Sequence, residues 1–404
     1  MKGINCERRI SSVKSTQAYV GLLMFVFING LFLFKYLGRI NAVFGIVSVG
    51  IYVAAVFYLS RLLYSHRMHV NAKFNLGLIV LYVCGLLVFL WYIPKESFGV
   101  DRWSVITSFW DFALDGKYPY FAQSFSGNYP GPMPFYFILA FPFYLIGEIG
   151  LFSISGLLLL LYFFRKKKSD DTFVYSSFLL LSSTIIFWEI SCRSTLLINA
   201  VLIFILLYFL VDIKEMDKKR FWMSAIISGL LLSTRSSFSL VFVVWGIYVL
   251  KNNLLPFRKL FVWGIVFVLS FSLTFLPLVL FFPNDFFVMN PFVIQSSFLL
   301  PVNWIPPLFI IAIISGFLCK NKMDVIFYSG LTLFVAILIY FFYHIAGNGV
   351  FIALWESVID AVLQNSARAS GVTTVILGEV IDTSYFTMAI PFILYTISSQ
   401  IHRQ

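Results

Sequence analysis

The 404-residue chain is 60% hydrophobic and 19% aromatic, and only 12% of its residues are charged. Soluble globular domains carry about 25% charged residues, so this composition excludes that class and indicates a membrane protein. The formal net charge of +11 does not indicate nucleic-acid binding, because the basic residues lie in short clusters between apolar runs, where they orient membrane helices.

Apolar runs long enough to cross a bilayer recur along the chain and predict an all-α fold, a polytopic transmembrane helical bundle of about 12 spans. The predicted spans are 16–34, 40–60, 75–93, 132–164, 172–190, 196–212, 221–234, 236–250, 260–282, 304–318, 325–343 and 384–398. The run 132–164 is interrupted by Pro142, Gly147 and Gly150. We count it as one crossing and leave open whether the chain passes once or twice.

The distribution of Lys and Arg predicts the orientation of these spans. With the N-terminus inside, 21 of the 29 basic residues lie in cytoplasmic segments and 8 lie on the other side. Both termini are then cytoplasmic, and the long loops 94–131, 283–303 and 344–383 are outside. We expect one multi-pass domain over 1–404 in the cell membrane: three spans in 16–93, an outer catalytic loop at 94–131, and the remaining spans in 132–404.

Residues 103–115 of the first outer loop predict an amphipathic helix. The residues on its apolar side are Trp103, Ile106, Phe109, Trp110, Ala113 and Leu114. Such a helix, rich in Trp and Phe, is typical of the membrane interface. Asp101 precedes it at a plausible N-cap position, so this carboxylate either caps the helix or carries chemistry. Asp111 and Asp115 lie on the polar side and are most simply solvated.

Three pieces of this loop occur together: Asp101 with Trp103, then "LDGKYPY" at 114–120, then "NYPGPMPFYFILAFPFYLIGEIG" at 128–150. The arrangement resembles the GT-C superfamily of membrane glycosyltransferases and is most similar to its polyprenyl-phosphate-mannose-dependent mannosyltransferases. The resemblance implies transfer of a hexose such as mannose from a polyprenyl-phosphate donor to an acceptor hydroxyl of a lipid or glycan on the non-cytoplasmic face. It implies Asp101 as the catalytic base. A single base in one displacement predicts inversion.

No metal site is predicted. Some GT-C members carry Asp-x-Asp where this chain has Asp101, Arg102 and Trp103, so a paired-carboxylate site is not indicated. The four cysteines are scattered without a CxxC pair, which indicates neither zinc nor a disulfide framework. No cofactor is expected, and dependence on a divalent metal is left open.

Arg193 and Arg235 lie at short outer turns between apolar runs. A guanidinium near the bilayer centre costs about 2.5–3.5 kcal/mol even on lenient scales, so such residues carry either a partner or a function. Arginine binds phosphate through a planar fork of donors. We therefore predict that both bind the donor phosphate, the alternative being that they anchor helices. Glu189, four residues before Arg193, is its expected ion-pair partner.

The remaining candidate substrate contacts are polar or aromatic residues of the outer loops. They are Arg102, Tyr118, Tyr120, Tyr129 and His344, with Asp285, Asn290 and Gln295 as candidate contacts to sugar hydroxyls. Aromatic faces can stack on sugar rings, and Tyr and Trp suit the interfacial depth. The 344–383 loop is a candidate lid on the acceptor side.

Two other functions remain open from the sequence. A transporter or flippase for a lipid-linked glycan predicts charges near the centres of spans, and Glu148 is the main residue of that kind. A polysaccharide polymerase or O-antigen ligase also has large outer loops and functional arginines. It would use a diphosphate-linked oligosaccharide as its donor.

Overall fold

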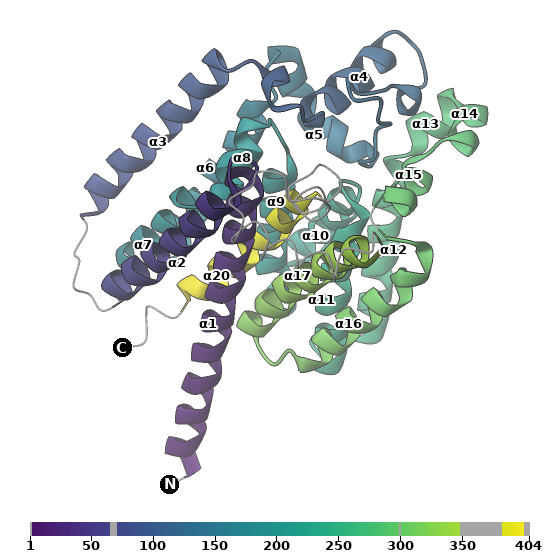
Figure 1. The fold of residues 1–404 in the computed structure, drawn as a ribbon. Helices are drawn as coiled ribbons and strands as arrows, with labels where there is room; N and C mark the ends of the chain where they lie inside the picture. The colour runs from purple at the N-terminus through teal and green to yellow at the C-terminus, as the bar shows by residue number, and fades with distance from the viewer. Residues whose placement is uncertain (1, 65–70, 299, 348–381, 400–404) are drawn as a thin grey trace. The chain divides into compact units, whose positions relative to one another are not determined.

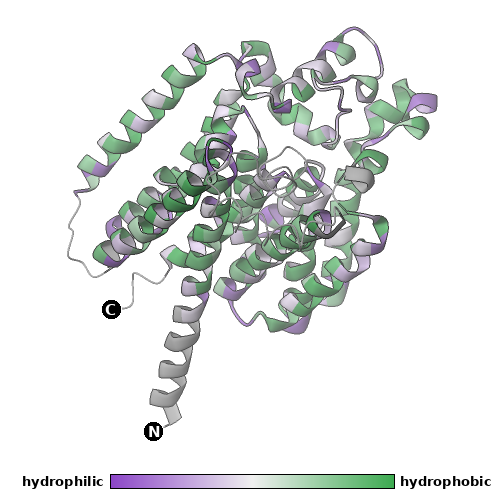
Figure 2. Cartoon of the chain, in the orientation of Figure 1, coloured by the Kyte–Doolittle hydropathy of each residue, from purple (hydrophilic) through white to green (hydrophobic). Residues whose placement is uncertain are grey.

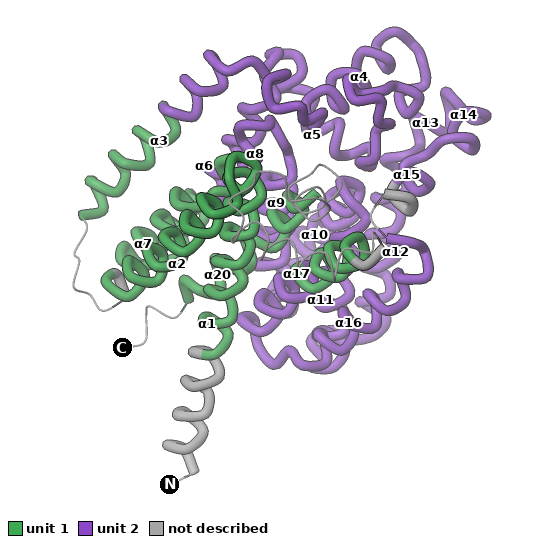
Figure 3. The backbone as a smooth tube through the Cα atoms, in the orientation of Figure 1, with its two compact units in different colours: residues 1–84, 161–188, 334–404 green, residues 85–160, 189–333 purple. Residues whose placement is uncertain are grey.

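A computed structural model describes residues 2–64, 71–298, 300–347 and 382–399, and every regular element in these residues is helical (Figure 1). The predicted all-α class is therefore confirmed. The chain forms two compact units (Figure 3). Unit 1 comprises residues 1–84, 161–188 and 334–404, and unit 2 comprises residues 85–160 and 189–333.

Four helices are long and apolar enough to cross a membrane: Thr16–Leu37 within α1 (Lys2–Leu37), Ala42–Leu62 within α2 (Ala42–Tyr64), α3 (Ala72–Tyr92) and Lys322–Ile345 within α17 (Lys322–Gly347). They coincide with four of the predicted spans. Figure 2 shows apolar residues along these helices. The composition and these helices are compatible with a membrane location.

Two further apolar segments are bent pairs of helices. The chain bends by 116° between α5 (Pro134–Ile146) and α6 (Gly150–Lys167), and by 60° between α7 (Asp170–Leu181) and α8 (Thr184–Ser191). The first break follows from Gly147, which adopts a left-handed conformation with φ of 87° and ends α5. The 132–164 run is therefore a broken span or a re-entrant loop rather than one straight helix.

The other predicted spans form shorter helices. They are α9 (Leu196–Leu210), α10 (Lys218–Leu232), α11 (Ser239–Lys251), α12 (Phe257–Leu273), α16 (Ile305–Leu318) and α20 (Ile390–Ser398). A straight crossing needs about 20 apolar residues, and the longest of these helices has 17. Counting each bent pair as one span gives up to six spans by length and composition in the described residues, so the count of twelve stays a prediction.

Unit 1 is built around α20 (Ile390–Ser398) and the preceding 3-10 helix η6 (Thr383–Ala389), and every residue from Thr383 to Ser398 is buried. α1 packs against α2 and α20, and α20 packs against α7. Gly21 allows the α1–α20 approach, since a Cβ there would lie 3.2 Å from Ile397. Asn29 of α1 supports the α7–α8 break: its Oδ1 accepts from Ser183 Oγ at 2.8 Å.

Unit 2 contains two close helix pairs, α10 with α12 and α11 with α16. Gly229 and Gly316 stand at the two contacts, where a Cβ would lie 2.2 Å from the Phe267 carbonyl oxygen and 2.8 Å from the Val244 carbonyl oxygen. The remaining helices of the unit are short. They are η1 (Lys95–Phe98), α4 (Arg102–Leu114), η2 (Pro119–Phe121), η3 (Ile213–Glu215), η4 (Ser236–Phe238), α13 (Leu276–Phe281), α14 (Pro283–Val288), α15 (Pro291–Phe298) and η5 (Val302–Trp304).

Candidate functional site

The predicted helix of the first loop is present as α4, and its apolar face packs against α5. The rings of Phe109 and Phe137 are stacked with centroids 3.7 Å apart, and Trp110 Nε1 donates to the Phe137 carbonyl at 3.0 Å. Leu114, expected on the apolar side, is 61% exposed at the helix end. Part of the face expected to meet the membrane interface is thus used within the protein, and the interfacial position of α4 stays a prediction.

Asp101 occupies the N-cap position of α4, but its side chain forms no capping hydrogen bond. Its carboxylate is directed instead to the later part of the loop. Oδ2 accepts hydrogen bonds from Ser124 Oγ and from Asn128 Nδ2, each at 2.7 Å. Asp101 therefore joins the start of α4 to residues 23 and 27 positions later in the chain.

The two carboxylate oxygens of Asp101 differ in their surroundings. Oδ2 carries both hydrogen bonds, whereas Oδ1 has no partner among the residues that the structure describes. The residue is half-buried. A carboxylate held through one oxygen keeps a fixed orientation and leaves the other oxygen able to accept a proton, which is the geometry that a general base requires.

An aromatic wall stands next to Asp101. The Lys95 ammonium lies 4.1 Å from the ring centroid of Trp103, and Trp103 and Phe125 are stacked at 6.1 Å with planes 15° apart. Phe125 remains 52% exposed. Ser104 Oγ accepts from the Phe125 backbone N–H at 3.2 Å and so fixes this ring near the start of α4. The wall offers an exposed aromatic face of the kind that stacks on sugars.

Two of the three tyrosines that were predicted to contact the substrate instead form hydrogen bonds that hold the loop in place. Tyr118 donates from its hydroxyl to the Met289 carbonyl at 2.6 Å, and Tyr120 donates to the Pro132 carbonyl at 2.9 Å. Burial raises the pKa of both hydroxyls well above their usual value, and the charge of Asp285 adds to the rise at Tyr118. Tyr129 is 41% exposed and is the most accessible of the three.

Arg193 is buried and its guanidinium contacts the protein on several sides. Nε donates to Glu148 Oε1 at 3.1 Å, Nη1 donates to the Ser191 carbonyl, and Nη2 donates to the carbonyls of Leu90 and Ile93 at 2.9 and 3.1 Å. Its ion-pair partner is Glu148 and not the Glu189 expected from the sequence, because Arg193 lies beyond the end of α8 with a positive φ of 54°, so the spacing of residues within a helix no longer sets its neighbours. A phosphate contact would require this network to open.

Ser194, the next residue, connects the arginine turn to α4. Its hydroxyl donates to Glu189 Oε2 at 2.5 Å and accepts from Arg102 Nη1 at 3.5 Å. Arg193 holds the end of α3, from which the loop departs, and Ser194 holds Arg102, directly after Asp101. The 193–194 turn thus fixes both ends of the segment that presents Asp101.

Arg235 lies at the start of η4, half-buried, with its guanidinium carbon 5.7 Å from the Tyr136 ring centroid. The adjacent Thr234 carbonyl accepts from the Met133 backbone N–H at 3.3 Å. Arg235 is thereby tied to the end of the loop that begins with Asp101, although no direct contact joins the two residues.

The other predicted contacts belong to other helices. His344 lies in the last turn of α17, in unit 1, with its ring 4.7 Å from that of Tyr340. Asn290 caps α15 by accepting from the backbone N–H groups of Phe292 and Val293. Most of the predicted last outer loop, residues 348–381, and the side chain of Gln295 lie outside the described residues.

Lys95, Ser124 and Asn128 are site residues that the sequence did not indicate, and Glu148 was indicated only as a charge within a span. Among the residues described, no three His, Cys, Asp or Glu side chains gather to hold a metal ion. Comparison of the chain with protein-family models, with curated proteins and with solved structures finds no match in any of the three.

Proposed function

We propose that the protein is a membrane glycosyltransferase of GT-C type that transfers a hexose from a polyprenyl-phosphate donor to an acceptor hydroxyl on the non-cytoplasmic face. The observation that supports this function best is the Asp101 carboxylate. It stands in a polar, aromatic loop between apolar helices, with Oδ2 held by Ser124 and Asn128 and Oδ1 without a described partner.

In the proposed reaction, Asp101 Oδ1 takes the proton of the acceptor hydroxyl while the hydroxyl oxygen attacks the anomeric carbon. The bond from that carbon to the phosphate oxygen breaks, and the lipid phosphate leaves with the electron pair. Charge develops on the sugar ring as in glycoside hydrolysis. The exposed face of Phe125, beside Asp101, is suited to stack on the sugar. One displacement with one base inverts the anomeric carbon.

The departing phosphate needs a cation, and we assign this role to Arg235. It is half-buried beside the loop end, and the face of Tyr136 orients its guanidinium. Arg193 was predicted to share the role. Its contacts with Glu148 and three carbonyls support a positioning role instead, since they anchor the segment that carries Asp101.

The catalytic role is tested by Asp101→Asn in the purified protein reconstituted with a polyprenyl-phosphate hexose and an acceptor. An amide cannot take the proton, so the rate should fall by about 10²–10⁴-fold. Asp111→Asn is the matched control, because Asp111 is also a carboxylate of this loop that accepts one hydrogen bond, from Tyr144 at 2.7 Å. Loss of activity in Asp111→Asn with activity retained in Asp101→Asn would move the base to Asp111.

The phosphate role is tested by transfer rate against donor concentration with acceptor saturating. Arg235→Ala should raise the donor concentration needed for half-maximal rate, and Arg235→Lys should rescue it only in part, because lysine lacks the fork. Acceptor dependence should change little. Unchanged donor dependence in Arg235→Ala would leave Arg235 as a helix anchor.

Transport of a lipid-linked glycan is a second candidate, supported by the ion pair of Glu148 and Arg193 at the α5–α6 break. Broken helices and paired charges are features of transporter sites. Vesicles carrying a fluorescent polyprenyl-phosphate sugar separate the two functions. Movement of the lipid between leaflets without sugar transfer would favour transport. Activity only with a diphosphate-linked oligosaccharide as donor would favour a polymerase or ligase.

A further inference from the structure

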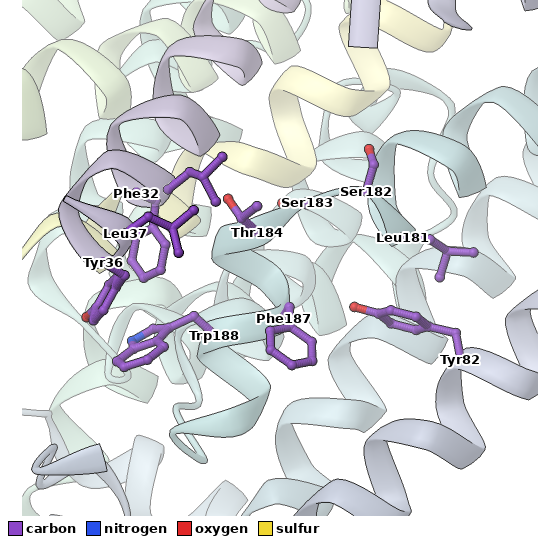
Figure 4. Close-up of a pocket in the computed structure, with 11 residues that line it drawn as sticks. Phe32, Tyr36, Leu37, Tyr82, Leu181, Ser182, Ser183, Thr184, Phe187 and Trp188 are labelled. Atoms are coloured by element: carbon purple, nitrogen blue, oxygen red, sulfur yellow. The ribbon is translucent and has the colours of Figure 1, made fainter. Parts of the chain in front are cut away.

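Unit 1 contains a pocket of about 290 Å³ at the α7–α8 break, with α1 and α3 forming its other walls (Figure 4). This volume is at the lower end of the roughly 300–1,000 Å³ of small-molecule sites. The lining is almost entirely apolar. The size and chemistry suit a section of one hydrocarbon chain rather than a whole lipid or a free sugar.

Aromatic rings form one side of this pocket. Tyr36 of α1 and Trp188 of α8 lie with ring centroids 4.0 Å apart, and Phe32 lies 5.8 Å from Trp188. Figure 4 shows Phe187 between Trp188 and Tyr82, which stands on the opposite side. A surface of this kind gains binding free energy by burying methylene groups.

The polar groups at the helix break are mostly satisfied within the protein. Thr184 Oγ1 donates to the Asn29 carbonyl at 3.0 Å, Ser183 Oγ donates to Asn29 Oδ1, and Ser182 Oγ donates to the Leu179 carbonyl at 3.1 Å. The Tyr82 hydroxyl differs. It is buried, has no hydrogen-bond partner in the described part of the chain, and is directed toward the other lining residues in Figure 4. A buried donor of this kind calls for an acceptor on the ligand.

A positive charge stands at the rim of the pocket. The Arg39 guanidinium carbon lies 5.0 Å from the ring centroid of Tyr36, and Arg39 is exposed just after the end of α1. A guanidinium beside an apolar pocket is suited to a phosphate attached to a hydrocarbon chain.

We propose that this pocket binds one acyl chain of an anionic glycerophospholipid, with the ester carbonyl accepting from Tyr82 and the headgroup phosphate near Arg39. The ester distinguishes this occupant from a polyprenyl chain, which has no hydrogen-bond acceptor beyond its phosphate. The bound lipid joins α1, α3 and the α7–α8 break of unit 1. This proposal does not depend on the glycosyltransferase function.

The experiment uses the full-length protein in phosphatidylcholine nanodiscs that contain phosphatidylglycerol with a photoactivatable acyl chain. Crosslinking followed by peptide mass spectrometry should label residues 32–37 and 181–188. Unlabelled phosphatidylglycerol should compete in the wild-type protein, so that the test does not rest on variants alone. Labelling spread evenly over exposed helices, without competition, would overturn the proposal.

Variants localise the site. Leu33→Trp fills the pocket and should abolish the specific label, whereas Leu23→Trp, on an exposed position of the same helix, should not. Tyr82→Phe should weaken competition about two- to tenfold, the effect of losing one hydrogen bond.

Arg39→Gln should reduce the preference for phosphatidylglycerol over phosphatidylcholine, and Arg61→Gln, exposed at the end of α2, should not. Stronger competition by polyprenyl phosphate than by phosphatidylglycerol would contradict the acyl-chain assignment.

Discussion

Arg193 shows how the chain accommodates a charge between apolar helices. Its Nη2 donates to the carbonyls of Leu90 and Ile93 at the C-terminal end of α3, where the helix dipole is negative. Glu148 neutralises its charge, with side-chain exposures of 3% for Arg193 and 29% for Glu148. The left-handed backbone of Arg193, unusual for a residue with a side chain, is held by these contacts.

Breaking this ion pair from either side should have unequal effects. Glu148→Gln leaves a buried guanidinium without a countercharge and should destabilise the protein by about 3 kcal/mol or more. Arg193→Met leaves a partly exposed carboxylate without a countercharge. The unpaired charge should therefore lower the free energy of unfolding less than in Glu148→Gln, although Arg193→Met also loses the hydrogen bonds to the carbonyls. Thermal unfolding in detergent measures both. Lys117→Met is the control, since its pair with Asp115 is exposed on both sides and should contribute almost nothing. Equal stability of Glu148→Gln and wild type would show that the pair is dispensable.

Lys168 predicts a pH dependence of stability in unit 1. Burial lowers the pKa of Lys168 to about 8, while its ammonium donates to Ser399 Oγ at 2.7 Å and lies 4.0 Å from the Tyr395 ring centroid. Below pH 8 the folded protein carries a partly buried charge at Lys168. As the pH rises above about 8, the folded state releases the proton before the unfolded state does, so stability should increase.

Melting temperatures between pH 7 and 9.5 check this expectation. The wild type should gain stability over that range relative to Lys168→Met, which should melt higher than the wild type at pH 7. Lys166→Met, at an exposed position two residues earlier, should retain the wild-type pH dependence. If the melting temperatures of Lys168→Met and wild type changed with pH in parallel, Lys168 would not be the source of the pH dependence.

At the scale of elements, two glycines on neighbouring helices make a matched test of packing. A Cβ at Gly229 of α10 would lie 2.1 Å from Ser270 Oγ and 2.2 Å from the Phe267 carbonyl oxygen of α12, whereas a Cβ at Gly246 of α11 meets nothing within 4 Å. Gly229→Ala should therefore force α10 and α12 apart and destabilise the protein by about 1–3 kcal/mol. Gly246→Ala should be neutral or stabilise it by up to about 1 kcal/mol. Similar melting temperatures for the two variants would show that α10 and α12 can move apart at little cost in stability.

Helices with a strong apolar or amphipathic pattern could be predicted from the sequence. α4 was expected at 103–115 and is found at Arg102–Leu114, because Trp103, Ile106 and Trp110 recur at spacings of three and four residues. The bend between α5 and α6 could not be predicted as an angle. Gly147 and Gly150 indicate a break, but the direction of the chain after Gly147 depends on packing between segments far apart in sequence.

The candidate site could be predicted only in part. Asp101 was indicated by its place before a helix and by the loop motif. Its hydrogen bonds to Ser124 and Asn128 were not indicated, since each depends on how a turn-rich segment folds back on α4. Pairing of Arg193 with Glu189 was wrong for a similar reason: spacing by four favours a pair within a helix, but Arg193 lies beyond the end of α8 in a left-handed conformation.

At the scale of the whole molecule, the distribution of charge remains the main evidence for orientation in the membrane. With 21 basic residues on one predicted side and 8 on the other, the positive-inside rule favours a non-cytoplasmic position for Asp101.

Cysteine labelling in intact cells tests this orientation. In a variant lacking the four native cysteines, Ser126→Cys should react with a membrane-impermeant maleimide from outside, and Lys166→Cys should react only after permeabilisation. Both positions are exposed in the structure, so labelling should depend on which side of the membrane the residue lies and not on its burial in the protein. Labelling of Ser126→Cys only after permeabilisation would place the proposed catalytic loop in the cytoplasm.

The unequal exposure of Glu148 and Arg193 also has an evolutionary consequence. Starting from this chain, a lineage that loses Glu148 first passes through a protein with a buried, uncompensated cation, whereas a lineage that loses Arg193 first keeps a carboxylate that water can partly reach. The second route is the more accessible one. Descendants carrying Glu148 without Arg193 should therefore be found more often than descendants carrying Arg193 without Glu148, and a swap of the two charges should require both changes within a short interval.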